Sequence, residues 1–181
     1  MPELAGCSWG DDDLYSSQHT GLKPRLLSHG TVETNDLEAA RRFYGEFLGM
    51  EVFQTSSRSI MMRLNSTTTI ACVQTKGENA AGIYSHFGLD FETRQEVDAA
   101  HEIAVAQKEK YAIRKVTRPV EQHGTYSFYV IDFDGNWWEI LTNPVDGYSY
   151  VFETEENTEI WRDQNQGRDR RPGWENVNSR S

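Results

Sequence analysis

Two stretches that decide the fold begin in the same way: Ser28-His29-Gly30-Thr31-Val32-Glu33 and Ser85-His86-Phe87-Gly88-Leu89-Asp90-Phe91. Their histidines are 57 residues apart (86 − 29), a period at which internal duplication is the first hypothesis to check. Both stretches are typical of β-strands, in which side chains alternate between the two faces. Phe87 and Leu89 therefore point to a core, whereas each histidine points to the opposite face.

The same order of elements follows both stretches. Asn35 with Glu38, and Thr93 with Glu96, have the spacing of a capping box, which marks the start of a helix. Apolar residues at helical spacing come next, and the second helix is expected to run to about Lys110. Three strands are then expected in each half: Val52–Phe53, Ser59–Leu64 and Thr67–Gln74, then Ile113–Val116, Thr125–Ile131 and Trp137–Thr142.

This repeat predicts an α+β fold of two similar βαβββ modules. We expect the modules to form one domain over residues 25–146, because 181 residues suffice for one domain with extensions. Residues 1–24 are expected to be a polar N-terminal extension. Residues 147–181 are a polar tail with aromatic residues, which suggests that the tail lies on the body or on a partner subunit.

The composition argues against several kinds of partner. The chain has 18 Lys and Arg against 28 Asp and Glu, a net charge of −10, so it would repel a phosphate backbone and nucleic acid is not expected. No apolar run approaches the roughly 20 residues that cross a bilayer, and no secretory signal opens the chain. Cys7 and Cys72 are far apart and are expected to be free thiols. We therefore expect a cytoplasmic protein without a membrane partner.

The last strand pair carries the densest set of chemical groups. It reads Ser127-Phe128-Tyr129-Val130-Ile131-Asp132-Phe133-Asp134-Gly135-Asn136-Trp137-Trp138-Glu139-Ile140. The Asp-Gly pair in its middle is typical of a hairpin turn. Tyr129 has the same strand parity as the upstream His123, so both are expected to face the same side as Glu139 if the hairpin is in register.

Two imidazoles and one carboxylate, with coordination positions left open, form the facial triad suited to Fe(II), Mn(II) and similar ions. His29, His86 and Glu139 are the candidates, because they have equivalent places in a repeated pattern. A single histidine on a strand is usually structural or faces solvent. Polar groups that are out of solvent need partners, however, which favours a metal site for the three together. Substrate, dioxygen or water would take the open positions.

In these residues the chain resembles the vicinal oxygen chelate superfamily, which includes glyoxalase I, bleomycin- and fosfomycin-resistance proteins and type I extradiol dioxygenases. The resemblance covers roughly residues 25–142, and its most specific part is the hairpin pattern Tyr-x-x-Asp-x-Asp-Gly-x-x-x-Glu. It implies that the paired βαβββ modules form a curved mixed sheet, a cup around a metal site, with His29, His86 and Glu139 as the ligands. Tyr129 falls where extradiol dioxygenases and fosfomycin-resistance enzymes have an active-site tyrosine.

The chain departs from each subfamily. Glyoxalase I has a carboxylate ligand on the last strand of its first module, where this chain has Ala71-Cys72. Two-domain extradiol dioxygenases have an acid/base histidine in that region, and only His123, on another strand, could substitute for it. Fosfomycin-resistance enzymes have an acidic, serine-rich potassium loop where this chain reads Gln122-His123-Gly124-Thr125-Tyr126-Ser127, although Thr31 matches. No subfamily is matched in full.

Several candidates have an ordinary explanation beside the functional one. His123 is either a proton shuttle or a loop histidine, and Tyr129 is either a site residue or a strand aromatic with a satisfied hydroxyl. Trp137 could line a pocket for an aromatic ligand, whereas Trp138 is expected in the core and His101 in solvent. Arg58 and Arg63 could bind an acidic substrate, although ordinary surface pairing is the more common role. Glu33 and Asp90 could be hydrogen-bond partners of the histidine ligands or simply charges at strand ends.

We expect a metal-dependent enzyme with a small, aromatic substrate. The leading hypothesis is an Fe(II) extradiol-type dioxygenase that cleaves the ring of a dihydroxylated aromatic, with Tyr129 hydrogen-bonding an oxygen and His123 moving a proton. The alternative is a metal-dependent lyase, isomerase or thiol transferase with Mn(II), Ni(II) or Zn(II). A third hypothesis is a metal-free protein that sequesters a ligand. We also expect a homodimer, with residues 147–162 at its interface or over the cup.

Overall fold

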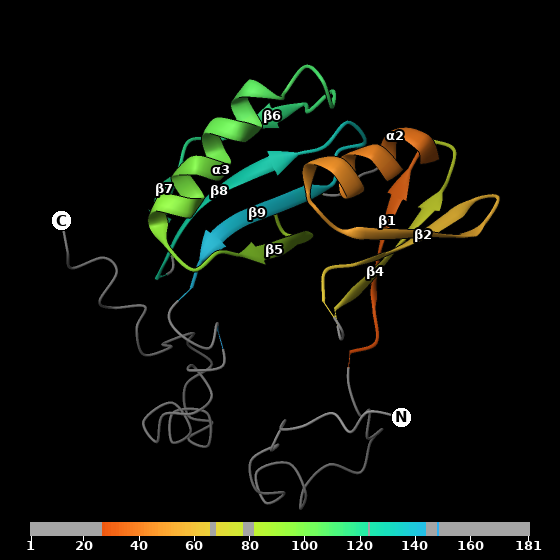
Figure 1. Ribbon diagram of the computed structural model, residues 1–181, viewed down its shortest axis with the longest axis horizontal. Helices are drawn as coiled ribbons and strands as arrows, with labels where there is room; N and C mark the ends of the chain where they lie inside the picture. Colours follow the sequence, from red (N-terminus) through yellow and green to blue (C-terminus); the bar gives the residue numbers. More distant parts are fainter. Residues whose placement is uncertain (1–26, 66–67, 78–81, 123, 144–147, 149–181) are drawn as a thin grey trace, which may run out of the picture.

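The computed structural model describes residues 27–65, 68–77, 82–122, 124–143 and 148, and has two sheets, each with a helix beside it (Figure 1). The first half contains β1 (Gly30–Thr34), α2 (Leu37–Arg42) continued by a π-helical segment (Phe43–Phe47), β2 (Glu51–Ser56), β3 (Ser59–Arg63) and β4 (Thr69–Gln74). The second contains β5 (His86–Asp90), α3 (Arg94–Ala106), β6 (Lys115–Val116), β7 (Val120–Gln122), β8 (Thr125–Ile131) and β9 (Trp137–Thr142). The extension predicted over residues 1–24 and nearly all of the tail predicted over residues 147–181 lie outside the described residues.

The two sheets have the same topology. Their strand orders are β1-β4-β3-β2 and β5-β9-β8-β6, and β7 pairs with β8. In each sheet the first strand is parallel to the last strand of the same half, with Gly30 opposite Ile70 and His86 opposite Trp137. The other pairs are antiparallel. This shared arrangement confirms the predicted α+β fold of two similar halves with mixed sheets.

The elements of the second half differ from the prediction in three places, one of which is that β6 begins at Lys115 and not at Ile113. The helix has the predicted capping box of Thr93 and Glu96, but it ends at Ala106, earlier than expected. The chain turns back after it, because Tyr111 and Ile113 are buried in the core. The three-residue strand β7 was not predicted, since so short a strand has no periodicity to detect.

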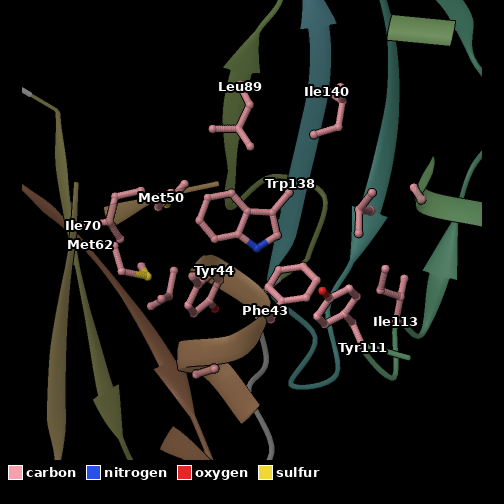
Figure 2. Packing of buried hydrophobic residues seen from close by; sticks show 14 of the residues in the cluster. Phe43, Tyr44, Met50, Met62, Ile70, Leu89, Tyr111, Ile113, Trp138 and Ile140 are labelled. Atoms are coloured by element: carbon pink, nitrogen blue, oxygen red, sulfur yellow. The ribbon is translucent and has the colours of Figure 1, made fainter. Parts of the chain in front are cut away.

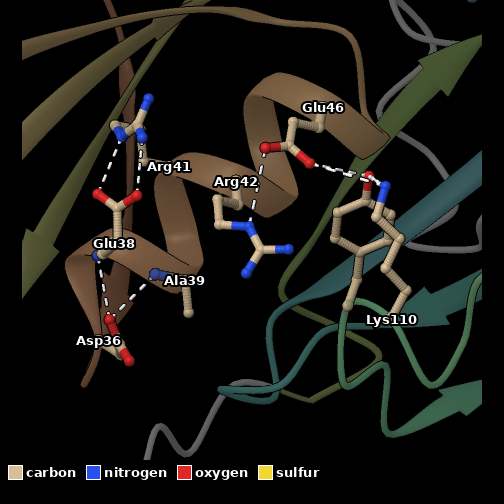
Figure 3. Close-up of polar contacts among 8 residues, drawn as sticks. Asp36, Glu38, Ala39, Arg41, Arg42, Glu46 and Lys110 are labelled. Atoms are coloured by element: carbon tan, nitrogen blue, oxygen red, sulfur yellow. Dashed lines mark hydrogen bonds and ion pairs between the residues drawn. The ribbon is translucent and has the colours of Figure 1, made fainter.

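The helix of the first half begins one residue later than predicted. Asp36 is its N-cap, and its carboxylate accepts hydrogen bonds from the backbone N–H groups of Glu38 and Ala39 (Figure 3). The side chain of Asn35 donates instead to Asp134 in the other half, 3.1 Å away. The capping box predicted from Asn35 is therefore wrong, because a tertiary partner engages that side chain.

Ion pairs along the same helix are exposed. Glu38 lies 2.7 Å from Arg41, and Glu46 lies 3.7 Å from Arg42 and 3.8 Å from Lys110, which comes from the second half (Figure 3). Exposed pairs of this kind stabilise a fold little. Among the described residues no helix is both long and apolar enough to span a membrane.

One core joins the two halves. Trp138, Tyr44 and Phe43 are its largest fully buried side chains, and the ring centroids of Tyr44 and Trp138 are 5.4 Å apart (Figure 2). Phe87 stacks on Trp138, with the two ring centroids 5.4 Å apart. A Cβ atom on Gly30 would come within 2.7 Å of the Phe87 ring, so the close approach of this ring to β1 favours glycine there.

The turn between β8 and β9 adds buried hydrogen bonds between the halves. Asp134 accepts from the hydroxyl of Thr34 at 2.5 Å and from the backbone N–H of Asn35 at 3.1 Å. Asp132 accepts from the hydroxyl of Tyr44 at 3.0 Å. Both carboxylates are almost completely buried. These hydrogen bonds hold the two modules together on the face of each sheet that its helix covers. Residues whose strand parity is opposite to that of the core residues, including His86, lie on the other face of each sheet.

Candidate metal centre

His86 and Glu139 come together on neighbouring strands. Glu139 lies opposite Gly88 in the parallel pair of β5 and β9, two residues along from His86, so both side chains project from one face. Nε2 of His86 is 3.2 Å from Oε2 of Glu139. The structure thus brings together two of the three ligands predicted from the sequence.

The backbone orients the ring of His86. Its Nδ1 lies 2.5 Å from the carbonyl oxygen of Ile83, and because a carbonyl can only accept, Nδ1 carries the proton. In a neutral ring Nε2 then has a lone pair, and this lone pair faces the carboxylate of Glu139. The lone pairs of Nε2 and Oε2 repel each other at that distance unless a cation lies between them, either a proton on Nε2 or a metal ion. Histidine ligands in metal sites commonly have this arrangement, with the second nitrogen bound to a carbonyl.

Glu139 is nearly buried, with 7% of its surface exposed. Its Oε1 accepts a hydrogen bond from the hydroxyl of Ser127 at 2.7 Å, and Nε2 of Gln122 lies 3.5 Å away. A buried ionised carboxylate is costly unless it is paired, so the second oxygen also needs a positive partner. A cation at Oε2, which faces His86, would meet that need. This nitrogen and oxygen donor set fits a divalent ion.

Tyr129 lies beside this pair, directly opposite Glu139 in the β8–β9 register. Its ring centroid is 5.5 Å from that of His86 and 5.7 Å from that of Trp137, in edge-to-face contacts. Burial and the charge of Glu139 raise the pKa of Tyr129 to about 12. The hydroxyl therefore stays protonated at neutral pH and can donate a hydrogen bond, while its oxygen accepts from Gln122 at 3.3 Å.

His29 immediately precedes β1, the edge strand of the first sheet, and is exposed. Its Nδ1 lies 2.8 Å from the hydroxyl of Ser28, so Nε2 is the nitrogen available to a ligand. Within the described part of one chain, His29 does not join His86 and Glu139, because no three His, Cys, Asp or Glu side chains there form a group that could hold a metal. His123 lies outside the described residues, and its role stays a prediction.

The other polar residues considered from the sequence have partners of their own. Hydrogen bonds or ion pairs link four of them to neighbours other than the histidines: Glu33 with Thr75, Asp90 with Asn143, Arg58 with Gln74, and Arg63 with Glu51. His101 was expected in solvent but is half-buried, with its ring centroid 5.1 Å from that of Phe128. Trp138 is in the core, as predicted.

Two contributors to the site were not predicted. Ile83 contributes its backbone carbonyl, which leaves no trace in the pattern of side chains. Gln122 contributes its side-chain amide from β7, and only recognition of that short strand beside Thr125 could have indicated it. Both depend on chain geometry that a sequence pattern does not carry.

The chain is similar to a known protein family and to several solved structures. The family model described as Glyoxalase/Bleomycin resistance protein/Dioxygenase superfamily matches residues 26–140. A mutant of the fosfomycin resistance protein FosX from Listeria monocytogenes, complexed with Mn(II) and 1S,2S-dihydroxypropylphosphonic acid, is 22% identical, with a TM-score of 0.55 over 69% of this chain and 95% of that one. FosX from Mesorhizobium loti is 22% identical, with a TM-score of 0.53 over 68% and 96%. None of the curated proteins matches the chain.

A possible glyoxalase from Bacillus cereus is 25% identical, with a TM-score of 0.53 over 65% of this chain and 99% of that one. These likenesses agree with the repeated topology and with the resemblance noted in the hairpin. The family model spans well over half of the 181 residues and includes both modules as far as β9. The chain therefore belongs to the Glyoxalase/Bleomycin resistance protein/Dioxygenase superfamily.

Proposed function

We propose that this protein is a metal-dependent enzyme in which His86 and Glu139 hold a divalent ion and His29 of a second copy is the third ligand. The observation that carries this proposal is the 3.2 Å contact between Nε2 of His86 and Oε2 of Glu139, with Nδ1 fixed by the Ile83 carbonyl. The donor set suits Mn(II), Fe(II), Ni(II) and Zn(II). The Mn(II) bound in a FosX mutant supports an ion of this class.

The position of His29 supports a ligand from a second copy. The residue is exposed on the first sheet, whereas the pair lies on the second. On the same face of the first sheet, Ala71, Met61 and Phe53 form a row across β4, β3 and β2, and Phe53 is 72% exposed. A second copy whose metal-binding pair faces this row would cover apolar surface and complete the triad.

The surrounding residues favour a redox-neutral reaction, such as isomerisation, elimination or addition of a nucleophile, on a small molecule with two neighbouring oxygens. When bound, a divalent ion supplies a Lewis acid that polarises those oxygens. Tyr129, protonated because its pKa is about 12, donates a hydrogen bond to an oxygen that gains negative charge. Trp137 offers an aromatic surface for the rest of the substrate. The FosX and glyoxalase-like neighbours support this class.

The Fe(II) ring-cleaving dioxygenase is the second candidate. The edge-to-face rings of His86, Tyr129 and Trp137 favour it, because they could flank a flat aromatic substrate. Its proton carrier would be His123, which the described residues do not include. The FosX and glyoxalase-like neighbours favour the redox-neutral reaction over this one.

Metal binding tests the ligand assignment. Titration of metal-free protein with Mn(II) should reveal one tight site per chain, and His86→Ala, Glu139→Gln and His29→Ala should each remove it. His101→Gln, which alters a histidine on α3 remote in sequence from the proposed ligands, is the control and should bind as the parent does. Undiminished Mn(II) binding by His86→Ala would contradict the assignment of the metal ligands.

Mixed copies test whether the site lies between chains. A heterodimer of His29→Ala with His86→Ala contains one intact triad if the ligands come from two copies, and none if they come from one. We expect Mn(II) binding to return at one ion per two chains in the heterodimer that is purified after the variants are refolded together. No recovery, with the dimer present, would contradict the shared site.

The choice of metal separates the reactions. A redox-neutral enzyme should turn over with Zn(II) as well as Mn(II), since its mechanism needs no electrons from the ion. A ring-cleaving dioxygenase should consume dioxygen with a dihydroxylated aromatic only when loaded with Fe(II) under exclusion of air. Ligand binding that persists in metal-free protein without any turnover would favour the sequestering protein instead.

A further inference from the structure

The side-chain amide of Gln122 lies among three oxygens of the candidate metal centre. Its Nε2 is 3.2 Å from Oγ of Ser127, 3.3 Å from the hydroxyl oxygen of Tyr129 and 3.5 Å from Oε1 of Glu139. Gln122 reaches them from the end of β7, which pairs antiparallel with β8. The side chain is half-buried, so these contacts lie partly out of solvent.

Hydrogen-bond chemistry fixes the direction of each contact. An ionised carboxylate can only accept, so the hydroxyl of Ser127 donates its single proton to Glu139 at 2.7 Å. Ser127 therefore has only a lone pair to offer Gln122, and the amide nitrogen, not the amide oxygen, must face it. The nitrogen has two protons, and its two shortest contacts in this group are to Ser127 and Tyr129.

The amide of Gln122 also fixes the direction in which the hydroxyl of Tyr129 donates. Because its oxygen accepts from Gln122, its proton is left to point toward Glu139 or a bound ligand. Glu139 is also fixed: Oε1 takes the hydrogen bond from Ser127, and Oε2 is left facing His86. The amide of Gln122 thus sets both hydroxyls as donors toward the metal-binding carboxylate and the open face.

We infer that Gln122 is a positioning residue of the metal centre, acting through Ser127 and Tyr129. This inference rests on the metal site proposed above. The amide holds the Ser127 hydroxyl in the rotamer that donates to Glu139, and this presents Oε2 as the ligand atom. Groups that orient a metal ligand in this way typically change metal affinity by 10- to 100-fold when they are removed.

Gln122→Met tests this role, since methionine has similar length and no N–H donor. The dissociation constant for Mn(II) should rise about tenfold. Glu121→Met is the matched control, because Glu121 is the next residue of the same strand and its carboxylate pairs with Arg94 on α3. The control should bind Mn(II) as the parent does, although it loses an ion pair. If Gln122→Met unfolds at a lower denaturant midpoint than the control, Gln122→Leu is used in its place.

A double-mutant cycle separates positioning from a general structural role. Ser127→Ala removes the group through which Gln122 acts on the carboxylate, so adding Gln122→Met in that background should raise the Mn(II) dissociation constant only about twofold. An equal factor in both backgrounds, or parental affinity in Gln122→Met, would overturn the inference while leaving the metal site intact. Absence of Mn(II) binding by the parent protein would overturn the metal site and the inference together.

Discussion

The hydroxyl of Tyr129 lies next to the buried carboxylate of Glu139 and accepts a hydrogen bond from Gln122. Burial and the neighbouring charge raise its pKa to about 12, while the hydrogen bond from Gln122 lowers it. At neutral pH the group is therefore a donor and not a base. The same carboxylate faces Nε2 of His86. The proposed metal ligands and the proposed donor to the substrate are therefore different residues.

Tyr129→Phe should retain Mn(II) affinity and slow turnover. Loss of one hydrogen bond that strengthens in the transition state costs about 2–3 kcal/mol, a rate loss of roughly 30- to 150-fold. The measurement is kcat with the best substrate from a panel of small molecules with two neighbouring oxygens. Tyr126→Phe, which removes a hydroxyl bonded to Asp98 on α3, is the control and should keep the parental rate. Loss of Mn(II) from Tyr129→Phe would show that the role is wrong.

At the scale of elements, the turn between β8 and β9 connects the strand of Tyr129 with the strand of Glu139. Asp132 lies in this turn and accepts from the hydroxyl of Tyr44 and from the side chain of Asn136. Burial raises the pKa of Asp132, and these hydrogen bonds oppose that rise. The turn thus joins the helix of one half to the strands that carry the site in the other.

Asp132→Asn should destabilise the protein even though it removes a buried charge. The new NH₂ group would meet the hydroxyl of Tyr44, the amide of Asn136 or a backbone N–H, which act as donors to Asp132 now. An unsatisfied buried polar group costs about 1–3 kcal/mol, measurable as a lower urea midpoint. Asp36→Asn is the control, because asparagine is an equally good N-cap. Equal midpoints for both variants would contradict the role of the turn.

At the scale of the whole molecule, one face of each sheet points away from the shared core. The first sheet has His29 at its edge and Phe53, 72% exposed, on the same face. The second has the pair of His86 and Glu139. A homodimer that brings unlike sheets of two copies together would cover the apolar row and complete the proposed site.

Sedimentation should therefore show a homodimer, and Phe53→Ser should shift it toward monomer. The unfolding free energy of the chain should change little, because the side chain is largely exposed. Val105→Ser, at a residue 53% exposed on α3, is the control and should leave the dimer intact. A chain ending at Gly147 tests the predicted contribution of residues 147–162, which should appear as a weaker dimer. A monomeric parent would contradict both the dimer and the shared metal site.

The sequence by itself determined the features that depend on short-range spacing. The alternation around His86 separated the core face from the face of the site, and Thr93 with Glu96 marked the start of α3. The hairpin of β8 and β9 has the predicted bounds, so Tyr129 and Glu139 lie opposite each other. Each of these follows from contacts within a few residues, or across a tight turn, where spacing fixes geometry.

Only the tertiary structure decided which distant groups meet. It brought His86 to Glu139, left His29 on the other sheet, and drew Asn35 from its expected cap to Asp134. It also brought the amide of Gln122 to the site from a strand that the sequence pattern did not indicate. The physical reason is that strand register and the packing of one module on another set these distances, and residues far apart in the chain compete for the same hydrogen-bond partners, so no local spacing determines the outcome.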